Sequence, residues 1–302
     1  MADIALRFHK DPLVLSAPID ETLARQGVQD PASEREFMDL IEPESVLEAQ
    51  RLEQMMGAQC MVTNTYDITR ARLAHARFED QSTEIAQASI EILRELRPQH
   101  IIASIGPTRL PIDPESRASL KQNRDQYARA VRDFGDGIDA VLLDGMVSLV
   151  DLKCALAGAK KATGLPVFAS VDLDAEGKMA GRATTWDEAL AVMVEFEADV
   201  VGFSTPAAPE AVLPLVKRAC AVAGAPLLVQ LKVGEHDSRD VNPGFRPVDI
   251  TPDNPYRTAD AMFDAGTAYL AAGAQFLRAV GKATPSYTGA LAIAGDGRDC
   301  VR

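Results

Sequence analysis

Short apolar segments alternate with longer segments of helical periodicity along most of this chain. This alternation is typical of parallel strands joined by crossover helices, because each buried strand is followed by a helix that packs back onto the sheet. We expect eight strands, at residues 13–17, 60–65, 101–106, 140–145, 166–172, 200–205, 226–233 and 275–281. Eight parallel strands favour closure, so the predicted fold is α/β, a single (β/α)8 TIM barrel.

The segments between the strands carry apolar residues at three- and four-residue spacing, as helices that pack one face against a barrel require. The clearest such helices are expected at residues 82–96, 117–134, 149–162, 185–197, 209–223 and 259–272. A chain of 302 residues is long enough for two domains, but α/β barrels of this size commonly form one. We therefore predict one domain over residues 1–302.

The charge balance excludes some classes of partner. The chain has 31 Lys and Arg residues against 44 Asp and Glu residues, a net charge of −13. Nucleic acids and anionic membrane surfaces would be repelled by such a protein. The first ten residues contain no extended apolar segment, and no apolar run is long enough to span a bilayer, so we expect a cytoplasmic protein.

The four cysteines give no sign of a metal or disulfide framework. Cys60, Cys154, Cys220 and Cys300 lie far apart and none forms a Cys-x-x-Cys pair. This spacing argues against both a zinc ribbon and a set of disulfides. We expect Cys154 and Cys220 to be ordinary helix residues, since free cysteine behaves as a small buried hydrophobe.

Two polar stretches interrupt the alternation, at residues 26–45 and 234–258. Loops of this length within a compact domain are usually functional or mobile. The second follows the seventh strand and would project from the C-terminal face of the barrel, where such folds place their sites. It is therefore either a lid over the site or an irregular excursion.

Short motifs at four strand ends resemble the zinc-dependent homocysteine S-methyltransferases. They are Thr-Asn-Thr-Tyr at 63–66, Gly-Pro-Thr at 106–108, the Asp-x-x-Gly-x-x-x-Gly stretch at 174–181, and Arg-Ala-Val-Gly-Lys-Ala-Thr-Pro at 278–285. Their order along the chain and their positions at strand ends carry the resemblance, which extends over residues 13–291. It implies a barrel enzyme that transfers a methyl group to homocysteine from methylated amines, sulfonium compounds or a methylated corrinoid on a partner protein.

In the family, three cysteine thiolates hold a zinc ion that activates the acceptor thiol. The corresponding positions here are Thr205, Val280 and Gly281, so the resemblance implies a branch without the zinc thiolates. The small-residue turn after strand one is replaced by Ser-Ala-Pro-Ile-Asp-Glu at 16–21. A glutamate that ends strand four is shortened to Asp144, and Lys232 stands where a turn asparagine is usual.

These departures add charged and polar groups near the barrel mouth. We predict that Asp144 and Lys232 are catalytic, and that substrate is bound by the other polar residues at strand ends, namely Asp20, Asn64, Asp172, Ser204 and Arg278. Lys282 is a further cation near the mouth. The alternative for each charge is a salt bridge between acid and base that has no role in function.

No metal ligands are predicted. Among the histidines, His236 lies beside Asp237 in the loop after strand seven and is interpreted as an ordinary loop residue. An oxygen-ligated hard cation at Asp20, Asp144 and Asp172 is the one metal alternative that the sequence leaves open. No cofactor-binding motif is present, and a corrinoid would be held by a partner protein.

The leading functional hypothesis is a zinc-independent methyltransferase acting on a small molecule. Without zinc, a thiol acceptor is only a few per cent thiolate at neutral pH, so a base or cation such as Lys232 or Lys282 would have to compensate. A second hypothesis is a non-catalytic barrel subunit that binds a small ligand or a corrinoid protein. A third is a lyase or hydrolase that uses the Asp and Lys residues of the mouth.

Overall fold

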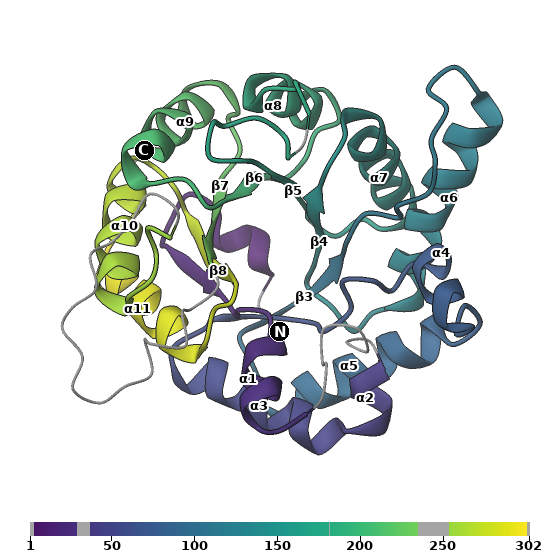
Figure 1. The fold of residues 1–302 in the computed structure, drawn as a ribbon, viewed down its shortest axis with the longest axis horizontal. Helices are drawn as coiled ribbons and strands as arrows, with labels where there is room; N and C mark the ends of the chain where they lie inside the picture. Colours follow the sequence, from purple (N-terminus) through teal and green to yellow (C-terminus); the bar gives the residue numbers. More distant parts are fainter. Residues whose placement is uncertain (1–2, 29–36, 181, 235–253, 301–302) are drawn as a thin grey trace.

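The computed structural model describes residues 3–28, 37–180, 182–234 and 254–300. Eight parallel strands close into a barrel in sequence order, with β1 pairing to both β2 and β8. Figure 1 shows the strands as an inner ring with the helices arranged around it. The predicted (β/α)8 TIM barrel is confirmed, whereas the assignment of all of residues 1–302 to one domain stays a prediction.

The strands are β1 (Leu13–Leu15), β2 (Cys60–Val62), β3 (His100–Ile105), β4 (Ala140–Met146), β5 (Val167–Asp172), β6 (Val200–Thr205), β7 (Leu227–Val233) and β8 (Phe276–Gly281). The helices are α1 (Asp20–Arg25), α2 (Met38–Ile41), α3 (Pro43–Met55), α4 (Arg70–Leu73), α5 (Ser82–Glu95), α6 (Arg117–Asp133), α7 (Leu149–Ala162), α8 (Trp186–Glu195), α9 (Pro209–Val222), α10 (Ala259–Ala271) and α11 (Pro285–Gly295). Short 3₁₀ turns occur at η1 (Ile4–Arg7) and η3 (Ala74–Ala76).

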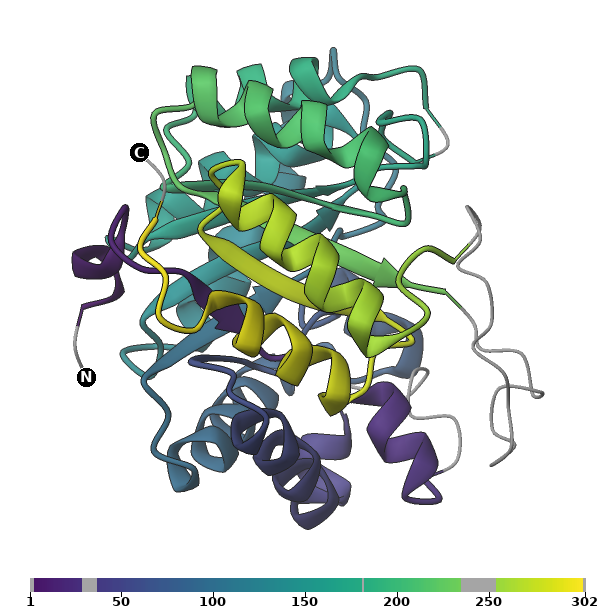
Figure 2. The same ribbon diagram turned by 90° about the vertical axis from the view of Figure 1, so that its left-hand side faces the viewer.

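Apolar side chains fill the half of the barrel interior that is nearer the starts of the strands. Phe168 and Phe276 meet edge to face with ring centroids 4.9 Å apart, and Phe8 packs against both rings from below. The N-terminal segment that carries Phe8 thus closes this end of the barrel. Figure 2 shows η1 and α1 at opposite ends of the molecule. Because η1 lies at the closed end, a site is expected at the end where α1 lies.

The outward-facing strand residues pack against the helices and form the main core. Trp186 begins α8 and is buried against Phe203 with ring centroids 4.9 Å apart, as expected for a packing residue. The start of α8 is fixed by a capping box between Thr185 and Glu188. A smaller apolar cluster lies under α1, α2 and α3.

The structure corrects one sequence interpretation and leaves another open. The polar stretch 26–45 contains α2 and the beginning of α3, because Pro43 stands at the first turn of α3, where proline favours a helix. Of the predicted lid, residues 235–253, which include His236, lie outside the described residues. The described residues on either side of this gap are in contact, because the Gly234 N–H donates to Asn254 Oδ1 at 3.1 Å.

Candidate active site at the barrel mouth

Alternate residues of each strand point into the barrel, so polar residues two positions apart stack in layers above the apolar interior. Strand register brings Asp172 beside Ser204, Ser204 beside Gln230, and Gln230 beside Arg278. These residues come from β5, β6, β7 and β8. Their side chains therefore converge on one face although they are far apart in sequence.

The floor of the mouth is a buried network around Arg278. Its Nη1 donates to Asp144 Oδ2 at 2.7 Å and to Gln230 Oε1 at 3.2 Å, and its Nε donates to the Ser16 carbonyl at 2.9 Å. Gln230 Nε2 in turn donates to Asp144 Oδ1 and to Ser170 Oγ, both at 2.8 Å. The Arg278 and Asp144 side chains are only 4% and 12% exposed, so this ion pair is held rigidly at the base of the site.

A second cluster lies above the floor, closer to solvent. Asp172 accepts a hydrogen bond from Ser204 Oγ at 2.8 Å and contacts Lys232 Nζ at 3.3 Å through both carboxylate oxygens. The Lys232 side chain is 42% exposed and Asp172 is 23% exposed. Lys232 therefore pairs with Asp172, while the other predicted catalytic residue, Asp144, pairs with Arg278.

Two adjoining cavities occupy this end of the barrel. The larger, of about 270 Å³, is lined by Asp20, Asp172, Ser204 and Lys232, among others. The smaller, of about 30 Å³, has room for one or two water molecules or a small polar group and is lined by Asn64 and Arg278, among others. Both cavities share Pro18, Tyr66 and Asp144 in their walls.

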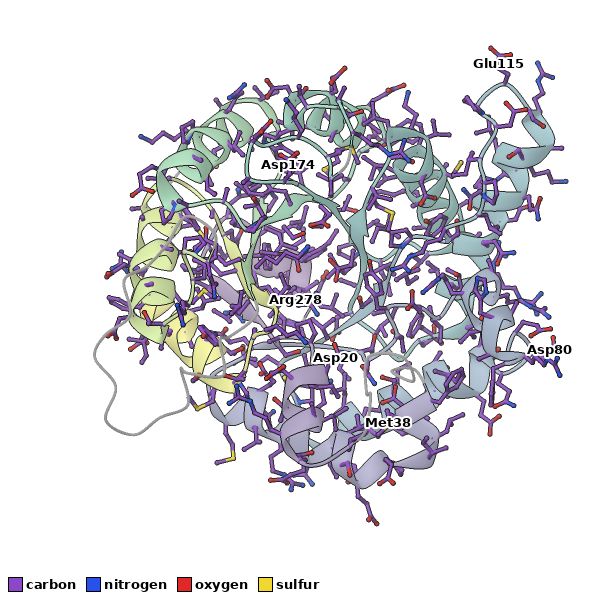
Figure 3. All side chains as sticks on the ribbon, viewed as in Figure 1. Asp20, Met38, Asp80, Glu115, Asp174 and Arg278 are labelled. Atoms are coloured by element: carbon purple, nitrogen blue, oxygen red, sulfur yellow. The ribbon has the colours of Figure 1, made fainter. Side chains whose placement is uncertain are left out.

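All seven residues predicted for the site line one or both of these cavities. Figure 3 shows Arg278 within the ring of strands and Asp20 beside it at the start of α1, with Glu115 at the outer edge of the molecule. Lys282, the other predicted cation, lies outside both linings, and its Nζ is 4.0 Å from Glu21 Oε2. The structure thus shows the location of the predicted residues, and their roles stay predictions.

Sequence reasoning missed several polar residues of this region. Gln230 and Ser170 occupy inward positions two residues before Lys232 and Asp172, and a glutamine within the apolar run of β7 was the signal for the first. Glu53 and Gln50 come from the buried face of α3. Their signal was the pattern Val46, Ala49, Gln50 and Glu53, which places two polar side chains on the apolar face of a helix.

The model of the homocysteine S-methyltransferase family matches residues 13–281, which is most of the chain. This chain belongs to the homocysteine S-methyltransferase family. Two curated relatives are methionine synthases: the Mycobacterium tuberculosis protein is 28% identical over 173 residues and the Mycobacterium leprae protein is 27% identical over 168 residues. Each match covers 51% of this chain but only 14% of the relative, so the chain corresponds to a small part of those proteins.

Solved structures show the same fold at lower identity. The homocysteine methyltransferase MmuM from Escherichia coli, in its oxidised form, superposes with a TM-score of 0.74 at 18% identity, covering 93% of this chain and 95% of that one. A methyltransferase from Methanosarcina mazei superposes with a TM-score of 0.62 at 13% identity, covering 95% and 94% of the two chains.

The zinc site that the family resemblance implies does not fit the residues of this chain. Thr205 uses its hydroxyl to donate to the Asp174 carbonyl at 3.2 Å. Gly281 has φ = +75°, and a Cβ there would lie 2.4 Å from the Val233 carbonyl oxygen, so the backbone has no space for a cysteine side chain. Val280 lines the larger cavity with an apolar side chain that cannot bind a metal.

The cysteines of this family member lie elsewhere. Cys60 is buried in the apolar interior below the site, Cys154 and Cys220 are on α7 and α9 as expected, and Cys300 follows α11. Burial raises the pKa of Cys154 to about 11, which keeps this thiol protonated at neutral pH. Within the described part of the chain, no three His, Cys, Asp or Glu side chains gather so as to hold a metal ion.

Among the helices that the structure describes, none has the length and apolar content needed to cross a bilayer.

Proposed function

We propose that this chain transfers a methyl group from a small-molecule donor, or from a methylated corrinoid on a partner protein, to an acceptor that is not activated by thiolate-bound zinc. Family membership supports methyl transfer. The observation that carries the zinc-independent part is the mouth itself, where Asp172 holds Lys232 and Ser204 above the Arg278–Asp144 pair and no cysteine lines either cavity.

The size of the larger cavity supports a small substrate. Its volume of about 270 Å³ lies just below the range of roughly 300–1,000 Å³ that is usual for ligand pockets. The cavity wall contains Asp20, Asp144 and Asp172 against Lys232, and Arg278 pairs with Asp144 in the floor. Three carboxylates against two cations favour a cationic methyl donor. A sulfonium or quaternary ammonium compound fits this charge, because it leaves as a neutral sulfide or amine once its methyl group has been transferred.

Lys232 and Asp172 are placed to act on the acceptor. A cation lowers the pKa of a neighbouring X–H group by stabilising its anion, and Lys232 Nζ is held at the cavity wall by both oxygens of Asp172. In the proposed step, the acceptor proton moves to an Asp172 oxygen as the acceptor lone pair forms a bond to the methyl carbon. The electrons of the broken carbon–sulfur or carbon–nitrogen bond leave with the donor.

Asp144 and Arg278 are proposed to hold the reacting groups in place. Asp144 lines both cavities. Its Oδ1 accepts from Gln230 and its Oδ2 from Arg278, which leaves lone pairs for a further donor from substrate. Asn64 and Arg278 line the smaller cavity, and a polar end group of the substrate would fit there. Ser204 would keep Asp172 oriented through its hydrogen bond.

The proposal is tested by a donor and acceptor screen on the purified chain. Methyl-labelled sulfonium and trimethylammonium compounds would be offered with thiol and amine acceptors, and labelled product measured by mass spectrometry. We expect transfer from at least one cationic donor, and only slow turnover with free homocysteine, because a thiol without a metal is mostly protonated at neutral pH.

The outcomes separate the alternative functions. Binding of these compounds without any transfer would overturn the proposal and favour a non-catalytic barrel subunit. Conversion of a donor to products that do not include a methylated acceptor would favour a lyase or hydrolase. Transfer that appears only when a methylated corrinoid protein is added would support methyltransferase activity and identify the corrinoid as the methyl donor.

A further inference from the structure

We infer that Glu53 is a positioning residue for the site, which acts by sharing the charge of Arg278 with Asp144 and by fixing the turn after β1. This inference rests on the proposal that the barrel mouth is the active site. Glu53 lies on α3, outside the barrel, and lines neither cavity. It would therefore influence substrate through Arg278 and the turn, without touching substrate.

The position of Glu53 is unusual for a carboxyl group. Its side chain is completely buried, at 0% exposure. Oε2 accepts the Ala17 N–H at 2.9 Å and the Thr288 hydroxyl at 2.6 Å, while Oε1 is buried without a hydrogen-bond partner. Burying a polar oxygen without a donor is costly, and far more so when the group is charged.

The two hydrogen bonds tie Glu53 to the site. Ala17 lines the smaller cavity, and the adjacent residue, Ser16, accepts the hydrogen bond from Arg278 Nε. Thr288 belongs to α11, which follows β8, the strand that carries Arg278. Glu53 thus connects the turn that accepts from the Arg278 guanidinium with the helix that follows the Arg278 strand.

Arg278 also attracts Glu53 electrostatically. Burial outweighs this attraction and raises the pKa of Glu53 from 4.5 to about 7. The proton on Glu53 is therefore exchanged near neutral pH. When Glu53 is ionised, its charge adds to that of Asp144 in the field at Arg278, and when Glu53 is protonated, Asp144 alone balances the guanidinium.

Glu21 of α1, Arg51 of α3 and Tyr287 of α11 bond to partners other than Glu53. Glu21 of α1 accepts from Arg25, and Arg51 of α3 pairs with Glu48 on the exposed side of the helix. On α11, Tyr287 donates to the Arg257 carbonyl. Within the described chain, Arg278 is the charged side chain whose field acts on Glu53.

The electrostatic field in the floor of the site should therefore depend on pH. A change of one unit charge behind Arg278 alters how strongly the guanidinium attracts a negatively charged group in the smaller cavity and repels a positive one. Protonation of Glu53 should therefore change substrate affinity, and kcat/KM should show an inflection near pH 7.

The ionisation of Glu53 can be measured without substrate. The carboxyl carbon resonances of glutamate-labelled protein would be followed against pH, and the Glu53 signal identified as the one missing from Glu53→Gln. We expect a midpoint near 7. A midpoint near the ordinary value of 4.5 would overturn the inference.

Two substitutions test whether Glu53 and Asp144 share Arg278. Asp144→Asn removes the competing carboxylate, so the Glu53 midpoint should fall, by about one unit. Arg278→Met removes the shared cation, so the midpoint should rise by a similar amount. If one variant does not fold, the other remains a sufficient test. A midpoint that moves in neither folded variant would contradict the shared charge.

The functional readout is the pH profile of methyl transfer. We expect the inflection near pH 7 to be absent from Glu53→Gln and retained in Glu48→Gln, a matched control on the exposed side of α3. An unchanged profile in Glu53→Gln would overturn the positioning role. If no donor supports transfer, the resonance titrations still decide the inference, so its failure can be distinguished from failure of the proposed function.

Discussion

At the scale of single residues, substitution of Lys232 tests whether this cation has a role in function or only in a salt bridge. Lys232→Met keeps most of the side-chain stem while removing the charge. Because the Lys232–Asp172 pair is partly exposed, its loss should change the free energy of unfolding by no more than about 1 kcal/mol. Methyl transfer should fall at least tenfold, a loss of about 1.4 kcal/mol in transition-state stabilisation.

The control for Lys232 is Lys153→Met. Lys153 is on the outer surface, with a side chain 46% exposed and a 3.9 Å pairing to Glu195. Both variants would be compared by urea unfolding and by turnover. A large loss of stability in Lys232→Met with turnover unaffected would assign the lysine to a salt bridge alone.

Glu53 makes a second prediction, on the pH dependence of stability. Its folded-state pKa of about 7 lies above its ordinary value of 4.5, so the folded protein binds more protons than the unfolded chain between these pH values. The Glu53 contribution is complete below about pH 4.5 and is lost as the pH rises through about 7. The difference corresponds to roughly 3 kcal/mol.

Urea unfolding of wild type and Glu53→Gln at several pH values measures this contribution, because the glutamine does not titrate. The free energy of unfolding of the wild type should decline, relative to the variant, as the pH rises through this window. Parallel curves for the two proteins would show that Glu53 is not buried as a titrating acid.

The sequence predicted the residues on strands better than those on helices. Asp144, Asp172, Ser204, Lys232 and Arg278 all follow from the position of a polar residue near the C-terminal end of a parallel strand. Glu53 could not be found this way, because its contact with the site depends on how α3 packs against α11 and the turn after β1. The ion pairs could not be predicted from the sequence either, because the length and direction of each side chain decide which acid contacts which base.

At the scale of elements, the periodicity located all eight strands and six of the helices to within a few residues. The elements it missed include α1, α3 and α11. Two of them, α3 and α11, begin with proline at the first turn, as the correctly located α9 also does, so proline alone does not account for the difference. The short α1 has too few residues to show a periodicity.

The close packing of α6 on α7 predicts that a glycine-to-alanine substitution in α7 lowers stability, the opposite of its usual effect inside a helix. Replacing glycine by alanine inside a helix usually stabilises it by about 1 kcal/mol. At Gly158 of α7, however, a Cβ would lie 2.4 Å from the Arg124 carbonyl oxygen of α6. Gly158→Ala should therefore lower the free energy of unfolding by about 1–3 kcal/mol, because the two helices must separate.

Gly164 provides the control for this substitution. It follows α7, has no unusual backbone angle, and a Cβ there would have no neighbour within 4 Å. Gly164→Ala should leave stability unchanged or raise it by up to about 1 kcal/mol. Equal effects of the two substitutions in thermal or urea unfolding would contradict the close approach of α6 and α7.

At the scale of the whole molecule, the barrel separates stability from chemistry. The N-terminal segment and the apolar interior close one end, while the polar layers collect at the other. The family fold is thus retained, while Thr205, Val280 and Gly281 supply no thiolate at the positions where the family resemblance would place the zinc ligands. A change of mouth residues on an unchanged scaffold is the usual way in which barrel enzymes diverge.

The central claim is methyl transfer without thiolate-bound zinc, and the most direct test is the rate of transfer before and after removal of metal. The purified protein would be assayed with the methyl donor found in the screen, treated with a strong chelator, and assayed again with and without one equivalent of added Zn²⁺. We predict no stoichiometric zinc in the purified protein and the same rate under all three conditions. A rate that is lost on chelation and restored by zinc would contradict the account.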